Sequence, residues 1–230
     1  MKKKTTTILC IVSMLVATAC LAWAEDTAKT PTIEVVGKAK LMVMPDVATI
    51  SFAVETNSSK AQDAVRENAA QTNTLLKALR EVSGNETKIK TSGFSLSPVY
   101  EERQRLRPSG YRVRNTVVVE TKDLDKVGAL IDEASRGGAG SIGSLTFGTD
   151  KEEKFAREAA AEALRDAVKS AEALAKAAGL TLKRIVGVTY TPRPPGVVRS
   201  LVAHAERVST PVEIGEIPVE ASVNVVFEVN

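Results

Sequence analysis

Cysteine and tryptophan are missing from most of this chain of 230 residues. Both cysteines, Cys10 and Cys20, and the only tryptophan, Trp23, lie among the first 24 residues. A chain that loses this segment has no disulfide, no cysteine nucleophile and no thiolate metal site. Its stability then rests on an apolar core, which a domain of about 200 residues is long enough to build.

An excess of positive charge is missing as well. The chain has 31 Lys+Arg and 28 Asp+Glu, and Lys2, Lys3 and Lys4 account for the formal net charge of +3. The rest is neutral, whereas nucleic-acid binding depends on an excess of basic residues. With five Phe and three Tyr there are few rings for base stacking. We therefore expect no nucleic-acid partner, and sheet packing explains Tyr111, Arg112 and Arg114.

The patterns that usually mark catalysis or metal binding are also missing. His204 is the only histidine, and it lies in a proline-flanked loop region without a Gly-x-Ser-x-Gly elbow. One histidine without cysteine does not make a typical zinc site. The interleaved acidic and basic residues from Glu152 to Lys176 are typical of a solvated helix face. We therefore expect no catalytic residue and no metal site.

A Gly-x-Gly-x-x-Gly motif is present at Gly138, Gly140 and Gly143. In dinucleotide-binding proteins this motif follows a strand and begins a helix, so that the helix N-terminus faces the pyrophosphate. Here it follows a predicted helix and precedes a predicted strand. The motif therefore predicts a turn, and we expect no cofactor.

The first 24 residues resemble a secretory signal. Three lysines precede an apolar stretch from Ile8 to Leu21, and Ala22-Trp23-Ala24 before Glu25 fits the small-x-small cleavage pattern. We predict cleavage between Ala24 and Glu25 and a periplasmic location. Two alternatives stay open: an uncleaved membrane anchor, because residues 8–24 reach the lower limit of about 17 residues for a span, and lipid attachment at Cys20.

Residues 25–230 alternate between strand and helix patterns. Period-2 alternation predicts strands at 33–43, 48–55, 89–100, 111–121, 142–147, 182–190 and 219–229. Helical spacing predicts helices at 59–84, 124–134 and 150–178, with Ser59 and Gln62, and Asp150 and Glu153, as capping boxes. We expect the first two strands to pair with each other beneath the first helix. The whole predicts an α+β fold, a mainly antiparallel sheet with long helices on one face, in one domain compatible with two ββαβ-type lobes.

Several segments resemble the SIMPL-domain family. They are Val36-Gly37-Lys38-Ala39-Lys40, Pro45-Asp46-Val47-Ala48, the stretch from Thr91 to Tyr100, and the stretch from Arg157 to Leu180. Members of this family are exported bacterial envelope proteins, of a periplasmic immunogenic type and of a type linked to oxidative-stress defence. The resemblance implies a fold and an exported location, and it implies no catalytic residue.

These observations favour a non-catalytic envelope protein that acts by self-assembly or binding and supports the response to oxidative or envelope stress. Two surfaces favour a homo-oligomer: the strand at 219–229, which we expect at a sheet edge, and the alanine-rich face of the helix at 150–178. We further expect contact with the envelope or its outer membrane. The alternatives are a periplasmic hydrolase that uses a serine with His204, and a carrier of small ligands or lipids with an apolar cavity between sheet and helices.

Overall fold

The computed structural model describes residues 30–100, 107–192, 198–199, 210 and 212–230. Its strands are β1 Thr32–Val43, β2 Val47–Ser58, β3 Thr87–Val99, β4 Gly110–Thr121, β5 Ser141–Gly148, β6 Leu182–Tyr190, β7 Val198–Arg199 and β8 Ile217–Val229. Its helices are α2 Ala61–Val82, α3 Val127–Arg136 and α4 Glu152–Ala178, with a short 3-10 helix η1 at Leu124–Lys126. The strands form two antiparallel sheets with helices on one face of each, which confirms the predicted α+β fold.

The three-stranded sheet has the order β1-β8-β6 and is covered by α4. Strands β1 and β8 pair without interruption from Thr32 opposite Glu228 to Val43 opposite Ile217. Alternate residues of both strands face α4 and are mostly buried, while the other face of the sheet carries no helix. Helix α4 lies close to this sheet because its buried residues are all alanines: Ala159, Ala163, Ala167, Ala171 and Ala175.

The five-stranded sheet has the order β3-β4-β2-β5-β7 and is covered by α2 and α3. Its core contains Ile50 and Phe52 from β2, and Leu75 and Leu79 from α2, all fully buried. A row of polar groups lies beneath α2 as well. The side-chain amide of Asn68 donates to the backbone carbonyl oxygens of Val54, at 3.1 Å, and Val113, at 3.4 Å.

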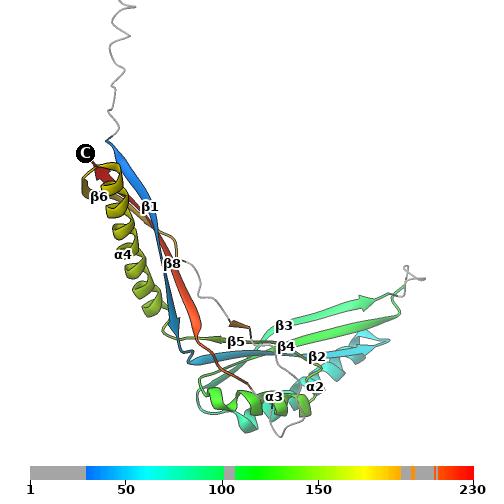
Figure 1. The fold of residues 1–230 in the computed structure, drawn as a ribbon. Coiled ribbons are helices and arrows are strands. Elements are labelled where there is room, and N and C mark those ends of the chain that lie inside the picture. Colours follow the sequence, from blue (N-terminus) through cyan, green and yellow to red (C-terminus); the bar gives the residue numbers. More distant parts are fainter. Residues whose placement is uncertain (1–29, 101–106, 193–197, 200–209, 211) are drawn as a thin grey trace, which may run out of the picture.

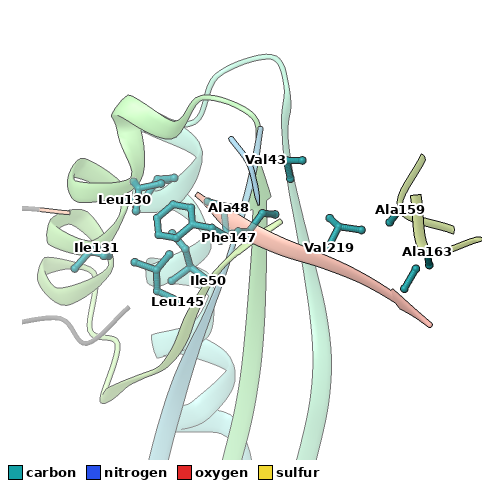
Figure 2. Close-up of a cluster of buried hydrophobic side chains, with 14 of the residues drawn as sticks. Val43, Ala48, Ile50, Leu130, Ile131, Leu145, Phe147, Ala159, Ala163 and Val219 are labelled. Atoms are coloured by element: carbon teal, nitrogen blue, oxygen red, sulfur yellow. The ribbon is translucent and has the colours of Figure 1, made fainter. Parts of the chain in front are cut away.

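The two sheets meet at an angle, and Figure 1 shows the helices on its outer side. Side chains from both units join one buried cluster at the junction. Figure 2 shows Val43 and Val219 between Phe147 of the five-stranded sheet and Ala159 of α4. The inner side of the angle is therefore formed by the two sheet faces that lack helices.

The predicted pairing of the first two strands is wrong. Strand β1 pairs with β8, and β2 pairs with β4 and β5, so consecutive strands belong to different sheets. The link Met44-Pro45-Asp46 therefore does not close a hairpin. The backbone N–H of Asp46 instead donates to the carbonyl oxygen of Gly148 at 3.0 Å, which directs the chain into the second sheet.

Both surfaces expected to bind a second copy are used inside the chain. Strand β8 is the central strand of its sheet and not an edge, because β1 and β6 pair on its two sides. The alanine face of α4 is buried against this sheet. Although β8 ends the chain, it lies in the middle of its sheet. The alanines of α4 allow close packing of this helix on the sheet of the same chain.

The predicted helices are present, but their starts and the buried face of α2 differ from the prediction. Lys60 and Lys151 are the N-cap residues of α2 and α4, and neither makes a side-chain capping bond, so both capping boxes were wrong. The buried face of α2 contains Asn68 instead of Val65, which is 36% exposed. Asn68 is buried because it donates to strand carbonyls, and this polar contact rotates the helix away from the face that hydropathy indicates.

Candidate functional site

Two long sheet edges are the candidate functional surface of the described chain. Among the residues that the structure describes, β3 pairs only with β4 and β6 pairs only with β8, so each has one side without a described partner strand. Residues 91–99 of β3 and 185–190 of β6 contain no charged side chain. We call these two stretches the open edges.

Apolar side chains are exposed along both open edges. Phe94 is 57% exposed and Leu96 is 43% exposed on β3, and Val188 is 52% exposed on β6. Pairing partners place Phe94 and Leu96 on the helix side of their sheet, opposite Asn115 and Val113 of β4. Each open edge therefore offers unpaired backbone groups together with apolar surface.

The other edge of the three-stranded sheet is protected. The backbone N–H of Lys38 on β1 donates to a carboxylate oxygen of Asp166 on α4 at 3.0 Å. This bond satisfies a backbone group that another strand would otherwise use. Charged side chains are a second form of protection, and they lie at the beginnings of the exposed strands: Lys88 pairs with Glu120 at 3.4 Å, and Arg184 pairs with Glu228 at 2.9 Å. The stretches beyond them carry no charge.

An exposed strand edge without charge can pair with another strand through its backbone N–H and C=O groups. Irregular register weakens such pairing, and β6 has register shifts near Ile185 while β3 has one between Thr91 and Gly93. Pairing is thus expected along the regular stretches that follow these shifts. The sequence contains a signal for these edges, since both are strand-like runs without charge, but the sequence alone does not identify them as edges.

Several residues considered from the sequence lie outside the described residues. These are Cys20, the cleavage pair Ala24 and Glu25, and His204. The structure therefore does not test the cleavage site, the lipid attachment or the serine–histidine hydrolase. In the described part of the chain, no group of three or more His, Cys, Asp or Glu side chains is arranged to hold a metal ion.

The glycine motif is a turn, as predicted. Gly137 caps the C-terminus of α3, Gly138 has a φ of 89°, and the N–H of Gly140 donates to Ala53 before β5 begins. Only glycine adopts such a φ without strain. The motif thus connects a helix to a strand and presents no helix N-terminus to a phosphate.

The charged groups considered for nucleic-acid binding or acid–base chemistry form ion pairs. Glu55 binds Arg112, at 3.1 Å, and Arg114, at 3.6 Å, on the neighbouring strand β4. On α4, Arg157 pairs with Glu153 and Arg165 pairs with Glu162 along the exposed helix face. This is the solvated face that the sequence predicts.

A family model described as "SIMPL: Protein of unknown function (DUF541)" matches residues 33–227. The chain belongs to the SIMPL family. The 26 kDa periplasmic immunogenic protein of Brucella melitensis biotype 1 is 29% identical over 224 residues, covering 90% of both chains. The uncharacterized protein YggE of Escherichia coli K12 is 26% identical over 230 residues, covering 96% of this chain and 92% of its own.

A solved structure, AtUAH in complex with glyoxylate, matches 55% of this chain and 34% of its own length at 12% identity. Its TM-score of 0.34 is too low to bear on fold or function. The description of the SIMPL family names no activity, and the names of these relatives indicate no catalytic role. In the described ranges, no helix combines the length and low charge that a membrane crossing requires.

Proposed function

We propose that this SIMPL protein is an exported, periplasmic envelope protein that acts by self-assembly through its open edges and supports the envelope under stress. The leader pattern supports export, and a relative with 90% coverage is named a periplasmic protein. The observation that carries the self-assembly is the absence of charge from residues 91–99 and 185–190 on strands that are paired on one side only.

Natural proteins protect exposed strand edges with charges, bulges, prolines or a covering segment. The edge of β1 is protected by Asp166, and the beginnings of β3 and β6 carry charged residues that form ion pairs. Phe94, Leu96 and Val188 remain exposed beyond these protections. A second copy of the chain is a partner that is always available. Pairing of edges between two copies would cover these side chains together with the free backbone groups.

Light scattering of the mature protein at several concentrations tests this proposal. We expect a mass above that of one mature chain. Phe94→Lys and Val188→Lys each place a charge on an open edge, and each should shift the mass toward one chain because the charge must be desolvated on pairing.

Leu174→Lys is the matched control, because Leu174 is 51% exposed but lies on α4 rather than on a strand. This variant should keep the mass of the unmodified protein. Far-UV circular dichroism of all three variants shows whether they fold. A mass of one mature chain at every concentration, with no substitutions, would refute self-assembly.

A further inference from the structure

A hollow of about 870 Å³ lies on the helix-free face of the three-stranded sheet, and Thr189 of the open edge of β6 is part of its lining. Its lining combines apolar residues with polar side chains: Val36, Ala39, Pro192 and Ala221 lie among Lys38 and Lys40 from β1, Thr189 from β6, and Glu220, Ser222 and Asn224 from β8. We call it the polar groove. Its volume lies within the range of about 300–1,000 Å³ that is usual for small-molecule sites.

The strand register explains why these side chains share one face. Lys38 is opposite Ser222, and Lys40 is opposite Glu220, while Asn224 is opposite Thr189 on the other side of β8. Residues two apart on a strand point to the same face about 7 Å apart. The two lysine side chains are therefore neighbours, and they line the groove beside a row of hydroxyl and amide groups.

Charge on this face favours an anion. Among the described residues, Lys38 and Lys40 form no ion pair with an acidic side chain. Two other acidic residues of the same sheet are engaged elsewhere: Glu228 binds Lys183 and Arg184, and Glu34 accepts a hydrogen bond from the amide of Asn224 at 2.6 Å. Glu220 also lines the groove and lies opposite Lys40 on the neighbouring strand.

An unpartnered side-chain oxygen of Asn224 is a second, independent observation. This atom, Oδ1, is buried and has no hydrogen-bond partner in the described structure. A buried acceptor without a donor is rare in folded proteins. A ligand hydroxyl would reach this oxygen only after the side chains around it move, whereas Thr189 and Ser222 beside it offer hydroxyl groups in the groove.

We infer that the polar groove binds an acidic sugar, with its carboxylate at Lys38 and Lys40 and its hydroxyl groups at Asn224, Ser222 and Thr189. The two lysines supply the charge complement of the carboxylate. The side-chain hydroxyls and amide both donate and accept hydrogen bonds, as sugar hydroxyls do. The ligand is either a free sugar acid or one residue of an acidic polysaccharide.

Isothermal titration with galacturonate and with trigalacturonate tests this inference and separates the two sources. Both probes should bind, and much tighter binding of the trimer would identify a polysaccharide, whereas equal affinities would identify a free sugar acid. The Lys38→Ala/Lys40→Ala double variant should bind about fivefold more weakly or worse, because it loses two solvent-exposed charge pairs. Lys77→Ala is the control, since Lys77 is exposed on α2, outside the groove, and it should bind like the unmodified protein.

Two further probes separate recognition of the sugar from charge attraction between the lysines and any anion. Glucose, which lacks the carboxylate, and inorganic phosphate, which lacks the sugar, should both bind more weakly than galacturonate. Asn224→Ala should reduce the preference for galacturonate over phosphate. Equal affinities for galacturonate and phosphate, equal affinities for galacturonate and glucose, or no binding of either acidic sugar would each overturn the inference.

Light scattering of the lysine double variant keeps this inference distinct from the proposed self-assembly. Its mass should equal that of the unmodified protein, because both lysines lie on β1, which β8 separates from the open edge of β6. A loss of mass in this variant would show that an acidic segment of a second copy occupies the groove, which also overturns the inference. Failure of sugar binding with the assembly intact leaves the proposed function unaffected.

Discussion

At position 37, even a methyl group would collide with helix α4. A Cβ on Gly37 would overlap the carbonyl oxygen of Ala163 and would lie 2.6 Å from the nitrogen of Ala167 and 2.8 Å from its Cβ. Real Cβ atoms do not approach backbone atoms so closely, and backbone atoms of a helix do not move aside as a flexible side chain does. Gly37 and the alanines of α4 thus form one close contact between sheet and helix.

Gly37→Ala should therefore lower the free energy of unfolding by about 2 kcal/mol or more, since α4 must move away from β1. Urea denaturation followed by circular dichroism measures this. Gly187→Ala is the control, because a Cβ there meets only side-chain atoms of Val226, at 3.7 Å and beyond. That variant should stay within about 0.5 kcal/mol of the unmodified protein, and equal losses in both variants would contradict the close contact.

At the scale of elements, one carboxylate connects the β1–β2 turn to the start of α4. Asp46 accepts a hydrogen bond from the backbone N–H of Asp150 at 2.8 Å and lies 3.4 Å from Nζ of Lys151. Lys122, which follows β4, contacts Asp150 at 2.5 Å. Three segments that are distant in the sequence are thereby joined near the junction of the two sheets.

The hydrogen bonds determine the pKa of Asp46. Burial by itself would raise this pKa, but the backbone N–H of Asp150 and hydrogen bonds from the side chains around it outweigh burial and hold the pKa below its usual value of 3.8. A carboxyl group whose pKa is lower in the folded state stabilises the fold above its unfolded pKa. This stabilisation is lost as the pH falls through the folded pKa.

We therefore expect Asp46→Asn to lower the free energy of unfolding by about 1 kcal/mol at pH 7. The difference between variant and unmodified protein should shrink as the pH falls from the unfolded pKa of about 4 through the lower folded pKa, because protonated Asp46 resembles the amide. Urea denaturation at pH 7 and at pH 3 measures both values. Asp63→Asn, which removes an exposed i,i+3 ion pair with Arg66, should change stability by less than about 0.5 kcal/mol. A difference for Asp46→Asn that is independent of pH would refute this role.

At the scale of the whole molecule, the predicted cleavage of the first 24 residues would remove both cysteines and the only tryptophan. We predict that protein from the periplasmic fraction begins at Glu25, because Ala22 and Ala24 provide the small side chains that the cleavage pattern requires. Intact mass spectrometry measures this. The mature protein should also show no tryptophan fluorescence, since Trp23 is removed with the leader.

Two variants separate this cleavage from its alternatives. Ala24→Arg should retain the leader, while Cys20→Ala should be cleaved like the unmodified protein. A species that retains Trp23, or a lipid on Cys20, would contradict the prediction.

The element types of this protein follow from local patterns. The alternation from Ile33 to Val43 and from Val219 to Val229 predicts strands, and helical spacing together with Gly179 predicts α4 and its end, where Gly179 adopts a φ of 68°. Such patterns depend on which face of a segment is apolar and on local backbone preference. The neutral charge outside the leader and the reversed order of the glycine motif were likewise readable from the sequence.

Partner choice was decided only in the tertiary structure. Alternation shows that a strand has a buried face, but it does not show which strand lies beside it. The sequence therefore predicts the wrong neighbour for β1 and an edge position for β8, which is the central strand of its sheet. For the same reason, local patterns do not predict the burial of Asn68, which depends on two carbonyls from different strands. They also do not predict the polar groove, whose lining comes from three strands. The sequence by itself therefore determined the elements, the neutral charge and the lack of cysteine outside the leader. The open edges and the groove depend on contacts between residues far apart in the chain, which no local pattern encodes.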